Sequence, residues 1–137
     1  METNGSLDFE KHKELLDYCD GVMLDIKAAD PAKHEELTGR GNEQVFKNAE
    51  FLAKENKLVE VRTLITGTDY GEEETIIKTA SLLRPFIKKN AIALKLIPFR
   101  VFGVRREFRS LGIPTQKKMD NLRVLAKSCG FKQVIIS

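Results

Sequence analysis

Two opposite charges stand in an otherwise apolar stretch near the start of the chain. Residues 21–27 carry apolar side chains at every second position, as a strand packed on one face requires, and the positions between include Asp25 and Lys27. Side chains two residues apart on a strand share a face, so the carboxylate and the ammonium lie together. Such charges are costly unless they are paired or bound. They form either a structural ion pair or part of a ligand site at the end of a parallel strand.

Two further apolar stretches each carry a cation. Arg62 lies in residues 58–65, and Lys95 lies in residues 91–99. Because the carboxyl ends of parallel strands meet at one rim, Arg62 can converge there with the charged pair of residues 21–27. A mixture of acid, hydroxyl and cations at one rim suits an anionic small molecule with several functional groups. The residues that compose this candidate site, including those in the adjoining loops, are Glu2, Thr3, Asp25, Lys27, Arg62 and Arg100.

The usual parts of a self-contained hydrolase are absent. His12 and His34 lie in surface-like helical segments, where a solvated or capping role is favoured over a catalytic one. No Ser or Cys stands in a nucleophile elbow, and no glycine-rich phosphate loop is present. The residues therefore indicate a ligand-binding site without a group that would break a bond.

The elements that must position these residues alternate between helix and strand. Alternating units of this kind imply an α/β protein with a parallel sheet and right-handed crossovers. The pattern does not distinguish a barrel from an open doubly wound sheet, and four strands are too few to close a barrel. Residues 1–5 read as a loop leaving a strand, and Pro85 is expected to bend or stop its helix. The expected elements are helix 8–18, strand 21–27, helices 30–39 and 42–56, strand 58–65, helix 72–89, strand 91–99, an irregular basic segment 101–113, helix 114–128 and strand 131–136.

Length and composition narrow the class of protein. The 137 residues are expected to form a single domain, and a formal net charge of +3 without a basic block gives no argument for nucleic acid. No membrane span or signal peptide is visible, so we expect a cytoplasmic protein. The two cysteines, Cys19 and Cys129, are far apart and read as reduced core thiols.

Five short motifs, in this order and spacing, resemble the C-terminal half of a radical S-adenosylmethionine enzyme. The subgroup they resemble is the pyruvate formate-lyase activating enzymes and other activases of glycyl-radical enzymes. The resemblance implies parallel β/α units forming the C-terminal half of a partial TIM-type barrel, and a chain that is a fragment of a longer enzyme. The motifs are Glu2-Thr3-Asn4-Gly5, residues 22–27, His34-x-x-Leu37-Thr38-Gly39-x-x-Asn42, Val61-Arg62 with Gly67-x-Asp69, and Leu96-Ile97-Pro98-Phe99.

The activity implied by the resemblance is radical chemistry on a protein partner. Enzymes of this family cleave S-adenosylmethionine reductively and abstract a hydrogen atom from a glycine of a glycyl-radical enzyme. Their four-iron four-sulfur cluster is held by a C-x-x-x-C-x-x-C loop, which this chain lacks and which Cys19 and Cys129 cannot replace. We therefore expect this chain to supply cofactor-positioning residues. By itself, the fragment is expected to be inactive.

The resemblance also assigns roles by position. Asp25 and Lys27 match residues that contact S-adenosylmethionine, and Arg100 stands where a histidine lies near that cofactor. Arg62 matches an arginine lining the active site and is the candidate catalytic residue. A monovalent-cation site corresponds to Glu2, Thr3, Met23 and Asp25, with Met23 contributing its backbone oxygen because a thioether is a poor ligand for a hard cation. Glu2 replaces the family's Asp and is longer by one methylene.

Alternative functions remain open. The chain could be a stand-alone α/β module that binds a ligand or a protein, or part of a radical S-adenosylmethionine enzyme acting on a small molecule. The basic run Arg105, Arg106 and Arg109 reads either as a solvated loop or as a docking segment for a partner protein. An open sheet edge also predicts self-association.

Overall fold

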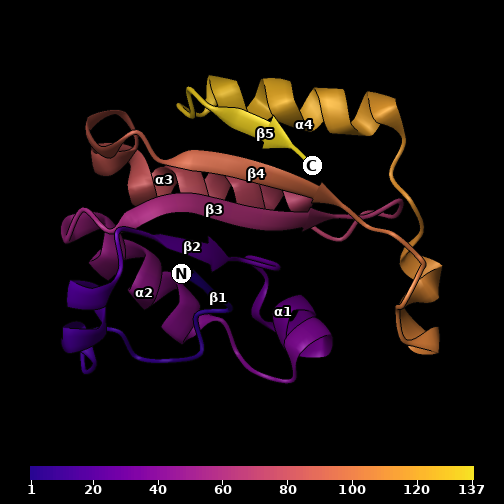
Figure 1. The fold of residues 1–137 in the computed structure, drawn as a ribbon. Helices are drawn as coiled ribbons and strands as arrows, with labels where there is room; N and C mark the ends of the chain where they lie inside the picture. The colour runs from indigo at the N-terminus through magenta and orange to yellow at the C-terminus, as the bar shows by residue number, and fades with distance from the viewer.

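The computed structural model describes residues 1–137 and contains five parallel strands, four α-helices and two 3-10 helices (Figure 1). The strands are hydrogen-bonded in chain order, β1-β2-β3-β4-β5. The elements are β1 (Glu2–Thr3), η1 (Lys13–Tyr18), β2 (Val22–Asp25), α1 (Pro31–Thr38), α2 (Glu43–Lys54), β3 (Leu58–Ile65), α3 (Glu72–Asn90), β4 (Ala93–Pro98), η2 (Arg106–Leu111), α4 (Gln116–Ser128) and β5 (Val134–Ile136).

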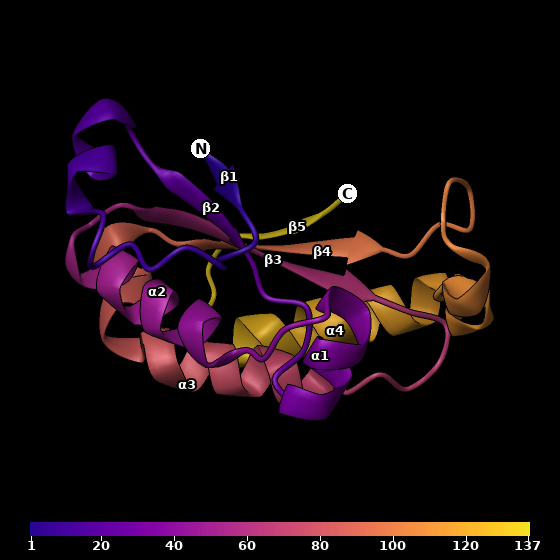
Figure 2. The ribbon, with the colours of Figure 1, turned by 90° about the horizontal axis from the view of Figure 1, so that it is seen from below.

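The four α-helices lie on one side of the sheet, and no helix covers the other side (Figure 2). Right-handed crossovers between strands that follow chain order place every helix on the same face, whereas a doubly wound sheet reverses its order and carries helices on both faces. The structure therefore resolves the choice that the sequence pattern left open. The sheet is one arc of a TIM-type barrel, which confirms the predicted fold class.

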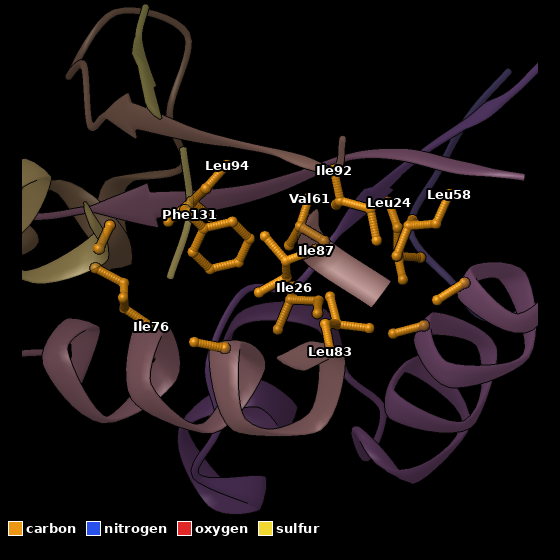
Figure 3. Packing of buried hydrophobic residues seen from close by; sticks show 14 of the residues in the cluster. Leu24, Ile26, Leu58, Val61, Ile76, Leu83, Ile87, Ile92, Leu94 and Phe131 are labelled. Atoms are coloured by element: carbon orange, nitrogen blue, oxygen red, sulfur yellow. The ribbon is translucent and has the colours of Figure 1, made fainter. Parts of the chain in front are cut away.

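The hydrophobic core fills the space between the sheet and the helices (Figure 3). The expected alternation in residues 21–27 is confirmed, because Val22, Leu24 and Ile26 are fully buried and the residues between them are only partly buried. Across the sheet, Leu24 is in register with Val61, which is in register with Leu94. This apolar row fixes which face of each strand meets the helices, so the charged residues of the same strands are placed on the uncovered face.

The first eighteen residues differ from the sequence-based expectation. Glu2 and Thr3 form a fifth strand, pairing with Met23 and Leu24, where only a loop was expected. Two residues are too short to show a period, so the pairing is fixed by β2 rather than by local pattern. The expected helix 8–18 was wrong in its first half: the Asp8 side chain accepts hydrogen bonds from the next turn of backbone, and only the 3-10 helix η1 follows.

Helix α3 spans the predicted residues and continues through Pro85 to Asn90, so of the expected bend or stop at the proline, the stop was wrong. Pro85 is exposed, and water can therefore satisfy the carbonyl that loses its partner. The strand predicted at 58–65 has the predicted bounds, the other remaining helices and strands are present with shorter bounds, and the segment 101–113 contains η2. None of the helices has the length and apolar character needed to cross a membrane.

The loop after β3 is in direct backbone contact with the end of the basic segment. The Gly67 amide donates to the carbonyl oxygens of Leu111 and Gly112, both at 2.9 Å. A Cβ at Gly67 would lie 2.7 Å from the Ile113 carbonyl oxygen, so only glycine allows this approach. The contact fixes η2 and the loop preceding it beside the carboxyl end of the sheet.

Candidate active site

A row of polar side chains crosses the uncovered face of the sheet. Asp25 of β2 is in register with Arg62 of β3, and Arg62 is in register with Lys95 of β4. Residues in register on parallel strands point to the same face, so these three side chains share the face that carries no helix. Parallel sheets are normally covered on both faces, which makes a partly buried row of charges here a candidate site.

Arg62 is held by two carboxylates from neighbouring positions. Its Nη1 atom lies 2.8 Å from Oε1 of Glu2, and its Nε atom lies 3.4 Å from Oε1 of Glu60. The Arg62 and Glu60 side chains are only 18% and 14% exposed. Neither the Nε atom nor the Glu60 oxygen has a partner with hydrogen-bond geometry. The guanidinium is thus oriented by charge while part of its donor capacity is left unused.

Asp25 and Lys27 form an ion pair at the end of β2. The Lys27 Nζ atom donates to Oδ2 of Asp25 at 3.0 Å, and both side chains are partly buried. The predicted pairing is present, and it lies beside Arg62 on the same face. One carboxylate and two cations therefore meet at the carboxyl end of β2 and β3, where parallel α/β folds bind ligands.

The proposed cation ligands lie next to one another on β1 and β2, because Glu2 is in register with Met23. Their side-chain oxygens already have partners: Glu2 binds Arg62, Asp25 binds Lys27, and the Thr3 hydroxyl accepts from the Gly5 amide at 3.1 Å. The longer side chain of Glu2 suits this use, since its carboxylate reaches Arg62 across the intervening strand. The cation site remains a prediction.

Arg100 is not brought into contact with the group. It is exposed, lies just beyond the end of β4, and makes no ion pair. The basic run Arg105, Arg106 and Arg109 is likewise exposed around η2. These four arginines follow the carboxyl end of β4 in the chain and are not part of the charged row on the sheet face.

A buried ion pair that the sequence reasoning missed lies beneath this end of the sheet. Glu72, at the first position of α3, accepts hydrogen bonds from the Thr66 amide and hydroxyl at 2.9 and 2.8 Å and from the Tyr70 amide at 3.0 Å. The Lys118 ammonium lies 3.2 Å from the same carboxylate and also donates to the carbonyl oxygens of Thr66 and Thr68. The pair joins α4 to the loop that follows β3.

Two residues near this end of the sheet were not recognised from the sequence, and only the first of them, Glu60, had a sequence signal. Glu60 is two residues before Arg62 and so shares its face, but the sequence reasoning gave it no role. His34 was interpreted as a surface residue, and this was wrong: it is 3% exposed, and its Nδ1 atom has no hydrogen-bond partner. Burial, and next the charge of Lys27, lower the pKa of His34, so its neutral form is favoured.

Comparison with known proteins gives sequence relatives among activating enzymes. The chain is 30% identical over 105 residues to the pyruvate formate-lyase-activating enzyme of Streptococcus mutans, covering 77% of this chain and 39% of that enzyme. It is also 30% identical over 137 aligned positions to the 4-hydroxyphenylacetate decarboxylase activating enzyme of Clostridium scatologenes, covering 91% of this chain and 42% of that enzyme. The predicted resemblance to glycyl-radical enzyme activases is confirmed. No protein-family model matches the chain.

A solved structure shares the fold of this chain. A crystal structure of a domain of pyruvate-formate lyase-activating enzyme from Bacteroides vulgatus superposes with a TM-score of 0.76, at 15% sequence identity, over 99% of this chain and 78% of that domain. At this identity the likeness establishes the fold alone. The chain spans about two fifths of the length of the curated activases described above.

Proposed function

We propose that this chain is the C-terminal part of a radical S-adenosylmethionine activase and that its uncovered sheet face positions the cofactor. The observation that carries the proposal is the register of Asp25 with Arg62, beside the Asp25–Lys27 ion pair, on a face that no helix covers. The similarity to activating enzymes supports the reaction class. In this reading, residues 1–137 form one domain of a longer enzyme.

The residues on this face fit S-adenosylmethionine. The cofactor carries a sulfonium, an ammonium and a carboxylate, and the face offers Asp25 to the cations and Lys27 and Arg62 to the carboxylate. The Glu60 carboxylate lies beside the Arg62 guanidinium, 3.4 Å from its Nε atom, and adds a second acid to this face. When bound, the cofactor supplies the hydrogen-abstracting chemistry, and the residues of this chain bind and orient it.

The iron–sulfur cluster does not fit this chain. Cys19 follows η1 and Cys129 follows α4, and no group of three or more His, Cys, Asp or Glu side chains gathers in metal-ligating geometry. We propose that the cluster ligands belong to the remainder of the longer enzyme. A glycyl-radical enzyme is the proposed protein partner, on the strength of the relatives' activating functions.

The proposal is tested with the longer enzyme that contains this chain, supplied with its cluster, S-adenosylmethionine and a glycyl-radical enzyme. Replacing Asp25 with Asn keeps the shape of the side chain but removes the charge that faces the cofactor cations. We expect the glycyl radical signal in electron paramagnetic resonance to form at least about tenfold more slowly, the loss of one charge-assisted contact.

The matched control is Asp120→Asn, since Asp120 is an exposed residue of α4 that pairs only with Gln116. It should leave the rate of radical formation unchanged. Equal rates for the wild type and Asp25→Asn would reject the assigned site. A longer enzyme that forms no glycyl radical, yet modifies a small molecule, would support the alternative substrate class.

A further inference from the structure

A pocket separate from the charged row on the sheet face lies where the segments that follow β1 and β2 meet α1 and the start of α2, and Lys27 lines it. Its volume is about 270 Å³, and Val45 is the only hydrophobic residue among those that line it. The lining side chains include the cations Lys27 and Arg40 together with His34 and Gln44, and none of the lining residues is acidic. Lys27 forms an ion pair with Asp25, whereas Arg40 forms no ion pair.

The first turn of α2 opens into this pocket without a side-chain cap. Asn42 holds the N-cap position of this twelve-residue helix, but its amide is buried and donates to the carbonyl oxygens of Ala28 and Ala29 at 3.1 and 2.8 Å. The amides of the first turn therefore lack an acceptor, and Gln44 and Val45 of that turn line the pocket. Free amides and the positive end of the helix dipole favour an anion there.

His34 provides an independent indication of a ligand. Its side chain lines the same pocket and is only 3% exposed. The Nδ1 atom of the ring has no hydrogen-bond partner. Burying an imidazole without hydrogen-bond partners destabilises the fold. An oxyanion in the pocket can accept a hydrogen bond from the ring, and its negative charge stabilises the protonated form. The position of His34 on α1 is held by backbone hydrogen bonding to Asp30 at 3.0 Å.

We propose that this pocket binds a small oxyanion, a carboxylate or phosphate group, held by the first turn of α2, His34, Arg40 and Lys27. Charge-assisted hydrogen bonds from these donors match such a group. A volume of about 270 Å³ lies just below the range of sites for drug-sized ligands, so the ligand is a small organic or inorganic anion. The proposal does not depend on the cofactor site, with which it shares only Lys27.

The test is a nuclear magnetic resonance titration of the two histidines of the 137-residue chain. Sulfate, as a tetrahedral anion, and acetate, as a carboxylate, are added in separate experiments at constant ionic strength set with chloride. We expect saturation by at least one of them to raise the pKa of His34, because an adjacent anion stabilises the imidazolium. The exposed His12 reports any general effect of the salt. The tighter anion identifies which chemistry the pocket prefers.

Arg40→Gln and Arg84→Gln provide a matched pair of variants, since both arginines are exposed and only Arg40 lines the pocket. We expect Arg40→Gln to weaken anion binding about tenfold, the loss of one charge-assisted contact, and Arg84→Gln to leave it unchanged. Equal shifts of His34 and His12, no shift with either anion, or equal effects of the two variants would overturn the proposal.

Discussion

Replacing Glu72 with Ala is expected to lower the free energy of unfolding of the 137-residue chain by about 3 kcal/mol, because it removes the negative partner of a partly buried ammonium and the acceptor of two buried donors. The Glu72 side chain is 4% exposed and accepts from Thr66 and Tyr70, while Lys118 binds the same carboxylate at 3.2 Å. Urea denaturation followed by circular dichroism measures the loss.

Glu73→Ala is the control, since Glu73 is exposed in the same first turn of α3. It should change the free energy of unfolding by no more than about 0.5 kcal/mol. If Glu72→Ala also costs less than about 1 kcal/mol, the carboxylate does not join α4 to the loop after β3.

The same carboxylate gives the stability a pH dependence of known sign. Burial raises the pKa of Glu72, but hydrogen bonds from Thr66 and Tyr70 outweigh it, so the pKa lies below its ordinary value of 4.5. A carboxyl with a lowered pKa in the folded state stabilises the fold above pH 4.5, and this contribution is lost as the pH falls through the folded value. The wild type should therefore lose more stability than Glu72→Ala on acidification below pH 4.5.

Replacing Arg62 with Lys is expected to slow glycyl radical formation by the longer enzyme about 100-fold, although the charge is retained. A lysine has one ammonium and cannot contact Glu2 and Glu60 with separate nitrogens, as the guanidinium does at 2.8 and 3.4 Å. The cation on the proposed cofactor face would then lose its fixed orientation. Single-turnover measurements of the radical signal, made at saturating cofactor, separate this effect from weaker binding.

Arg123→Lys is a suitable control, because Arg123 lies on α4 at the other edge of the fold and forms no ion pair. It should leave the rate unchanged. A rate for Arg62→Lys within twofold of the wild type would show that charge alone, without the forked geometry, is sufficient.

The sequence predicted the parallel sheet and the shared face of Asp25 and Lys27 for physical reasons. Strand residues alternate strictly, so the buried Leu24 and Ile26 placed Asp25 and Lys27 on the opposite face before any contact was known. The order of strands without reversal could not be predicted, because the pattern of elements is the same in barrels and doubly wound sheets. It became visible only from the pairing of β1 to β5.

What the sequence could not predict depends on contacts between distant segments. Lys118 reaches Glu72 across 46 positions, and no local pattern signals that pairing. The burial of His34 arises similarly from the chain around it, because α1 taken alone has a largely polar composition. The two-residue strand β1 has too few residues for a period, although Glu2 proved to be the partner of Arg62. Tertiary contacts decided each of these cases.

Amide chemical-shift perturbation of the 137-residue chain by S-adenosylmethionine shows directly whether the uncovered sheet face binds the cofactor. We expect shifts concentrated at Met23–Lys27, at the end of β2, and at Glu60 and Arg62 of β3, and we expect Asp25→Asn to weaken them. Shifts confined to the helical side of the sheet, or no shifts at millimolar cofactor, would contradict the assignment of the uncovered face as the cofactor site.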